Sequence, residues 1–203
     1  PGGFVLHTGD HNPGLKRALR DDAPGWPRLG LPLIIALAAS EPDDWSKLAE
    51  RLNDQPGVAG LELHLPSGVT TREAATWVAN IRRICELPVL VKLRATAAGP
   101  LAVAVAGAGA DVLVVGTPPA GAAAAPDGLF VEGPVAGPAA FPFTLRALRA
   151  VAALDLPTPL VAAGGITSIA AAQSCLDAGA QAVQVRSWLW TDPAGVIALV
   201  RGG

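Results

Sequence analysis

The sequence is short of several residue types, and each shortage narrows what the chain can do. It has no methionine, no tyrosine and two cysteines among 203 residues, and only 16% of the residues are charged, for a formal net charge of −2. Because no basic patch is present, we expect no nucleic acid and no anionic membrane as a partner. No Cys/His spacing is typical of zinc, so we predict no metal site.

Long apolar runs are also missing. Even the run at 31–39 is too short to cross a bilayer, and the first residues show no secretory signal. Cys85 and Cys175 lie in apolar segments, which indicates buried thiols in a reducing compartment. We therefore predict a cytoplasmic protein. Because the sequence starts at Pro1 and contains no methionine, we expect a processed chain or part of a longer polypeptide.

The sequence does have a regular alternation of strand-like and helix-like segments. At 51% hydrophobic it can bury one sizeable core, so we predict a single domain over 1–203. Apolar runs typical of parallel strands occur at 33–38, 58–65, 88–93, 111–115, 160–163 and 180–185. Helical patterns occur at 41–52, 71–84, 101–108, 143–153, 167–177 and 192–199, with Ser40, Thr70 or Thr71, and Thr167 or Ser168 near three of their starts.

This alternation predicts a parallel α/β fold. A complete TIM (β/α)₈ barrel needs about 250 residues, so about six β/α units predict a barrel whose first two units are missing from this chain. The main alternative is an open doubly wound sheet, but the sequence has no strand-bound G-x-G-x-x-G with a distant acidic residue. Residues 1–30 are expected to be mostly loop. Residues 116–138 predict a long loop, either a lid or a surface insertion.

One segment, 159–187, predicts a ligand class. An apolar strand there runs into Gly164 and Gly165, and a helix follows directly. Backbone N–H groups at a helix N-terminus bind phosphate well, and the last two units of a (β/α)₈ barrel are where that fold usually holds phosphate. The glycine pair is equally typical of a tight strand-to-helix turn. Both interpretations stay open.

Several segments, taken in order, resemble one family. They are LHTGDHNPGL at 6–15, LPLIIALAAS at 31–40, GLELHLPSG at 60–68, PVLVKL at 88–93, GADVLVVGTPPAG at 109–121, GPVAGP at 133–138, PLVAAGGITS at 159–168 and AGAQAVQVRSWLWTDP at 178–193. Together they are similar to the dihydroorotate dehydrogenase family. Those enzymes are FMN-dependent (β/α)₈ barrels that oxidise dihydroorotate to orotate in pyrimidine biosynthesis.

The resemblance implies roles for individual residues. Lys92 matches the lysine that contacts the flavin ring, where a cation would stabilise the anionic reduced flavin. Gly137 lies in the glycine turn beside the flavin, and Asn12 belongs to a mainly structural signature. The remaining cofactor-binding residues match the two turns that hold the FMN phosphate. They are Gly164, Gly165, Arg186 and Ser187.

The departures concern the substrate side. His64 stands where the family has an asparagine that binds the substrate, and Ser67 falls near the position of the catalytic base. A serine is a weak base alone, and His64 is the candidate to assist it. Thr117 occupies a substrate-binding position and is followed by Pro118 in place of a threonine. The serine of Ser-Gly-Pro is replaced by Ala136, and Arg186 opens a turn that often begins with glycine. An arginine there would either bind the phosphate or fill its place.

Three functions follow from these residues. The first is an FMN-dependent oxidoreductase acting on a small molecule, either as a homodimer or with a partner subunit. The second is a catalytically decayed paralogue that serves as a scaffold or regulatory subunit. The third is a phosphate-binding barrel without flavin, since the fold supports many chemistries.

Overall fold

The computed structural model describes residues 2–6, 12–39, 41–125 and 127–201, and it divides the chain into two compact units. Unit 1 comprises Pro1–Thr8, Leu93–Ala102 and Leu113–Gly203, and unit 2 comprises Gly9–Lys92 and Val103–Val112. The parallel strands follow the order β2-β3-β4-β5-β8-β9. The predicted α/β class with a parallel sheet is therefore confirmed.

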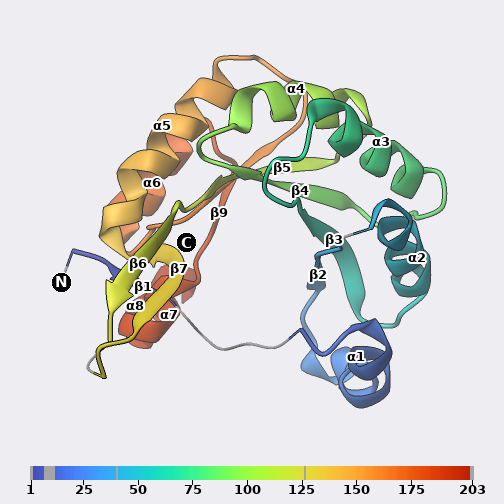
Figure 1. Cartoon of the computed structure of the whole chain (residues 1–203), viewed down its shortest axis with the longest axis horizontal. Coiled ribbons are helices and arrows are strands. Elements are labelled where there is room, and N and C mark those ends of the chain that lie inside the picture. Colours follow the sequence, from blue (N-terminus) through green and yellow to red (C-terminus); the bar gives the residue numbers. More distant parts are fainter. Residues whose placement is uncertain (1, 7–11, 40, 126, 202–203) are drawn as a thin grey trace. The chain divides into compact units, whose positions relative to one another are not determined.

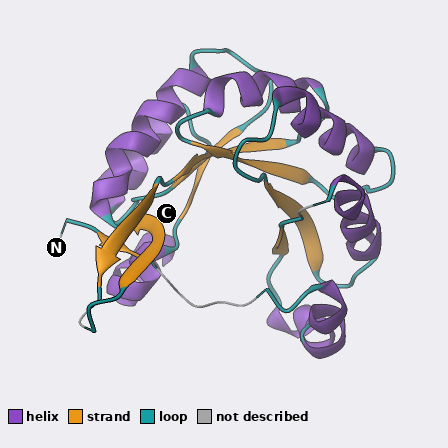
Figure 2. Cartoon of the chain, in the orientation of Figure 1, coloured by secondary structure: helices purple, strands orange, loops and turns teal. Residues whose placement is uncertain are grey.

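Unit 2 begins with helical segments and continues with strand–helix pairs (Figure 1). Strand β3 pairs in parallel with β2 on one side and with β4 on the other. Helices α2 and α3 lie side by side on the same side of these strands (Figure 2). The elements are α1 (Leu15–Asp21), a 3₁₀ helix (Ala23–Leu29), β2 (Leu33–Leu37), α2 (Pro42–Asn53), β3 (Val58–His64), α3 (Thr71–Arg82) and β4 (Val89–Arg94), whose last two residues belong to unit 1.

Local sequence signals explain where these helices begin and how they pack. The Thr70 hydroxyl accepts a hydrogen bond from the Glu73 N–H at 3.2 Å, while the Glu73 carboxylate accepts one from the Thr70 N–H at 2.9 Å. This capping box confirms the predicted start of α3. The predicted cap Ser40 lies outside the described residues. The rings of Trp45 on α2 and Trp77 on α3 stack with centroids 5.5 Å apart, and both residues are buried.

Unit 1 contains the remaining parallel strands with their helices. Strand β8 pairs in parallel with β5 and β9, and α5 packs against β8 and α6. The elements are β5 (Val112–Thr117), α5 (Phe141–Ala152), β8 (Leu160–Ala163), α6 (Ile169–Asp177), β9 (Ala182–Gln184), α7 (Ser187–Thr191) and α8 (Pro193–Arg201). Helix α4 (Ala98–Gly107) contributes residues to both units.

The prediction of a long structureless loop over 116–138 was wrong. Most of that segment forms the antiparallel hairpin of β6 (Ala120–Ala124) and β7 (Phe130–Ala136). Strand β1 (Phe4–Val5) pairs with β7 and completes a three-stranded sheet. The prediction missed this sheet because its residues are mostly glycine, alanine and proline, which have low strand propensity. Pairing across strands outweighs that propensity here.

The prediction of a mostly irregular 1–30 was also wrong, since this segment contains β1, α1 and a 3₁₀ helix. The predicted last helix at 192–199 corresponds to α8. The short helix α7 before it was not predicted, and Asp192 between the two helices has non-helical backbone angles. No helix among the described residues is long and apolar enough to cross a membrane.

Candidate functional site

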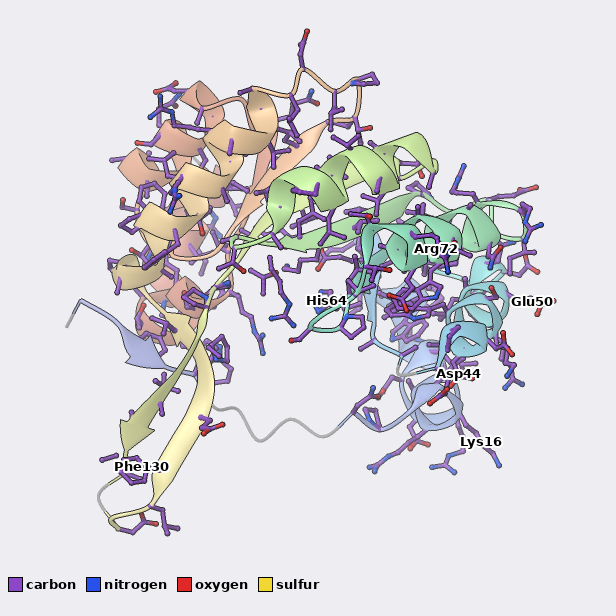
Figure 3. All side chains as sticks on the ribbon, turned by 45° about the horizontal axis from the view of Figure 1, so that its top comes forward. Lys16, Asp44, Glu50, His64, Arg72 and Phe130 are labelled. Atoms are coloured by element: carbon purple, nitrogen blue, oxygen red, sulfur yellow. The ribbon has the colours of Figure 1, made fainter. Side chains whose placement is uncertain are left out.

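The first polar cluster lies in unit 2, on strands β3 and β4. Glu62 and His64 are two residues apart on β3 and therefore share one face of it, and Lys92 is the register partner of His64 on β4. The His64 Nε2 lies 2.5 Å from the Glu62 Oε1, and the Lys92 Nζ donates to the same oxygen at 3.0 Å. Figure 3 shows His64 at the carboxyl end of β3. One carboxylate oxygen thus binds two nitrogen groups.

Burial differs sharply within this Glu62–His64–Lys92 cluster. The Glu62 residue is 5% exposed, and it is one of the two buried polar or charged residues among those described. The side chain of Lys92 is 18% exposed and that of His64 43% exposed. Burying a carboxylate is costly unless charged donors compensate for its lost water, which is the role of Lys92 and His64 here. The cluster is therefore buried at Glu62 and accessible to solvent at the His64 imidazole.

Ser67, the predicted base, lies in the turn between β3 and α3. It is exposed, and Leu65 between it and His64 is buried. Within the described part of the chain, no hydrogen bond joins Ser67 to His64. The imidazole is instead paired with Glu62.

The second polar region lies in unit 1, where β8 ends at Gly164 and Gly165. Both glycines have positive φ, +109° and +72°, which side chains rarely adopt. A Cβ on Gly164 would meet the Gly116 carbonyl oxygen, and one on Gly165 would meet the Phe141 backbone nitrogen. Close packing of neighbouring backbone therefore requires glycine at both positions. This supports the tight-turn interpretation and leaves phosphate binding by the turn a prediction.

Two further residues complete this turn region. The buried Thr144 hydroxyl contacts the carbonyl oxygens of Gly116 and Ala163 at 3.4 and 3.2 Å, which joins the ends of β5 and β8. The Ser168 hydroxyl accepts a hydrogen bond from the Ala171 N–H at 3.1 Å and so caps α6, as predicted. Side-chain hydrogen bonds therefore hold the strand that precedes the turn and the helix that follows it.

The remaining predicted site residues of unit 1 lie on separate elements. Thr117 ends β5, and its carbonyl accepts a hydrogen bond from the Ala95 N–H at 3.4 Å. Gly137 follows β7 with a φ of +80° and lies beside the Phe4 ring. Arg186 is exposed and immediately precedes α7, which begins with the half-buried Ser187. None of these positions, as described, tests the role that the resemblance implies.

Both cysteines are buried and free, as predicted. Burial raises the pKa of the Cys175 thiol to about 11, and it also raises the pKa of the Cys85 thiol. Thiols with raised pKa values are poor nucleophiles near neutral pH. Among the described residues, no group of three or more histidine, cysteine or acidic side chains is arranged to hold a metal ion.

The sequence did not single out Glu62, although it organises the cluster. A signal was present, because Glu62 is the one charged residue within the apolar run 58–63. A charged residue inside an otherwise apolar parallel strand is seldom buried without a partner. Its partner Lys92 lies thirty residues later in the chain, and strand pairing brings the two together.

Parallel strands that alternate with helices define a class, the α/β proteins, in which ligands usually bind beyond the carboxyl ends of the strands. No model of a known protein family matches the chain. Individual proteins do match it. One, from Desulforudis audaxviator, is 32% identical over 98% of this chain and 70% of its own length. Another, from Pelobacter propionicus, is 32% identical over 100% of this chain and 72% of its own.

Both relatives are named dihydroorotate dehydrogenase B (NAD(+)), catalytic subunit, as is a protein from Bacillus thuringiensis that is 29% identical over 95% of this chain. The chain belongs to the dihydroorotate dehydrogenase family. The resemblance drawn from its motifs is thereby confirmed.

Proposed function

We propose that this chain is an FMN-dependent oxidoreductase that converts dihydroorotate, or a close cyclic analogue, to the unsaturated product. Membership of the family supports this reaction class. The observation that carries the proposal is the placement of Lys92. Its ammonium group is held by Glu62 at the carboxyl end of a parallel strand, beside His64.

The chemistry of these groups fits FMN. Lys92 supplies a cation suited to an anionic ring, and the turn after β8 leads into a helix N-terminus suited to a phosphate. As the resemblance implies, Lys92 and Gly137 would contact the ring, and Gly164, Gly165, Arg186 and Ser187 would hold the phosphate. FMN would supply the acceptor for two electrons. The chain would bind it, orient the substrate and move a proton.

The substrate side of the proposal concerns three positions. His64 and Thr117 bind the polar edges of the substrate, and Ser67 lies on the exposed turn where the resemblance implies the base. A polar ring needs such partners, because its lost hydration must be offset.

We also propose that the strands belong to a (β/α)₈ barrel, of which this chain supplies about six units. The outer edge of β2 supports this, because the strand is wholly apolar and its Ile34 is 50% exposed. An apolar edge strand of this kind is normally covered by another strand.

We further propose a cytoplasmic enzyme that assembles with a partner subunit, since the relatives' names describe catalytic subunits. Those names also disfavour the decayed paralogue.

The test is whether the purified full chain retains flavin. We expect a yellow protein whose bound FMN is bleached by dihydroorotate without oxygen. Lys92→Met should lose most of the flavin, whereas Lys47→Met, at an exposed lysine on α2, should retain it. A colourless wild-type protein that takes up no added FMN would support the non-flavin barrel instead. A yellow protein that dihydroorotate does not bleach would support FMN as the cofactor but overturn dihydroorotate as the substrate.

A further inference from the structure

We propose that His64, oriented by Glu62, is the residue that receives the substrate proton, in the place where the resemblance implies a serine. This inference rests on the proposed function and names the proton acceptor within it. It is carried by the contact between His64 Nε2 and Glu62 Oε1.

The first step of the argument concerns the tautomer. A carboxylate only accepts hydrogen bonds, and the Glu62 oxygen already accepts one from Lys92. The His64 Nε2 must therefore carry the hydrogen that it shares with Glu62. In the neutral ring this leaves the lone pair on Nδ1, because the hydrogen bond of one ring nitrogen sets the state of the other.

The second step concerns access. Glu62 is buried behind the imidazole, while the side chain of His64 is 43% exposed. Within the described residues, no protein group is hydrogen-bonded to Nδ1. The basic nitrogen is thus the one left for a ligand, and the carboxylate behind it stabilises the ring when that ring becomes protonated, as in other carboxylate–histidine pairs.

The third step compares His64 with Ser67. At neutral pH an imidazole is a far better proton acceptor than a hydroxyl, and Ser67 has no hydrogen bond to His64 within the described chain. In the reaction, a C–H bond of the substrate breaks and its proton forms an N–H bond at Nδ1. The electron pair of that bond would become the second bond of the new C=C, and the hydride on the adjacent carbon would leave with its two electrons, for which bound FMN would supply the oxidant. Glu62 is a positioning residue in this scheme.

Among the described residues, the charged groups of this cluster are Glu62 on the same strand as His64 and Lys92 on β4. The Lys92 Nζ donates to the same Glu62 oxygen that contacts Nε2, so that oxygen accepts from both nitrogen groups. Replacing Glu62 by glutamine retains the shape but offers either a donor or an acceptor to the ring. We therefore expect Glu62→Gln to allow both neutral tautomers of His64 while leaving the strand intact.

The first experiment needs no cofactor. The ring nitrogens of the chain's three histidines are observed by ¹H–¹⁵N NMR at about pH 8, where imidazole is normally neutral, and His64 is assigned by its loss in His64→Gln. We expect the Nε2–H tautomer in the wild type and a mixture in Glu62→Gln. A predominant Nδ1–H tautomer in the wild type would overturn the inference.

The second experiment measures flavin reduction by dihydroorotate in single turnovers of the FMN-loaded protein. His64→Asn, which installs the amide that the resemblance implies, should slow this step by about 100-fold or more, the usual contribution of a positioned base. Ser67→Ala is the matched comparison and should slow it by less than about threefold. The reverse order would identify Ser67 as the base. A wild-type protein that is inactive would overturn the proposed function and the role of His64 in it, while the tautomer measurement would still decide the Glu62–His64 pairing.

Discussion

The two polar regions are built in opposite ways. In unit 2 the Glu62–His64–Lys92 cluster consists of side chains on paired strands, and none of these three residues has a positive φ. In unit 1 the turn after β8 consists of backbone, with two glycines in conformations and spaces that exclude a side chain. A site of the first kind can change its chemistry by one substitution without changing the fold. A site of the second kind cannot change in this way, because its glycines are also required for close packing of the backbone.

The largest effect that would test this difference is expected at Gly165. In Gly165→Ala the new Cβ meets the Phe141 backbone at a φ of +72°, so strain and clash add. We expect the free energy of unfolding to fall by about 4 kcal/mol. Urea denaturation followed by circular dichroism measures it.

Gly68 is the matched control for that substitution. Its φ is +80°, yet nothing lies within 4 Å of the position that a Cβ would take. Gly68→Ala should therefore lower the free energy of unfolding by about 1 kcal/mol, which is the cost of the left-handed backbone conformation alone. Equal losses at Gly68 and Gly165 would show that close packing does not constrain the turn after β8, and the contrast between the two regions would fail.

The cluster in unit 2 should respond in a different manner. Lys92→Leu removes the ammonium group that faces the buried Glu62 carboxylate, and we expect a loss of about 3 kcal/mol in the free energy of unfolding. Adding Glu62→Leu should recover most of that loss, because an apolar pair of similar size needs no compensation for burial. A double-mutant cycle on unfolding free energies measures the coupling. Additive losses would mean that the pair does not interact in the folded chain.

The sequence alone predicts most of the parallel framework, because that framework depends on local signals. Apolar runs mark all six parallel strands, and Thr70 and Ser168 mark two helix starts by their hydroxyl caps. The hairpin of β6 and β7 escaped prediction, since glycine and alanine carry little strand signal and the pairing with β1 is not local. The same reason hid the Glu62–His64–Lys92 cluster, whose members meet through strand register.

The prediction at Gly164 and Gly165 was limited in another way. A strand followed by two glycines and a helix is the same pattern whether the glycines serve a phosphate or the packing of neighbouring backbone. The contacts at Gly116, Thr144 and Phe141 that require glycine come from segments far away in the sequence. Only the folded chain shows that packing alone is sufficient reason for both residues.

The last expected effect concerns Cys175, on the helix α6 that follows the glycine turn, and it appears only at alkaline pH. The unfolded chain gives up this thiol proton near a pKa of 9.0, while burial holds it in the folded chain up to about 11. Between these values the unfolded state binds fewer protons, so the free energy of unfolding falls as pH rises. The contribution is fully present below pH 9.0 and is lost towards about 11. In Cys175→Ala the same curve, measured by urea denaturation over this range, should be flatter than in the wild type. The lysines titrate in both proteins, so their contribution cancels when the two curves are compared. Parallel curves for the wild type and Cys175→Ala would mean that the folded chain does not hold the thiol in its neutral form.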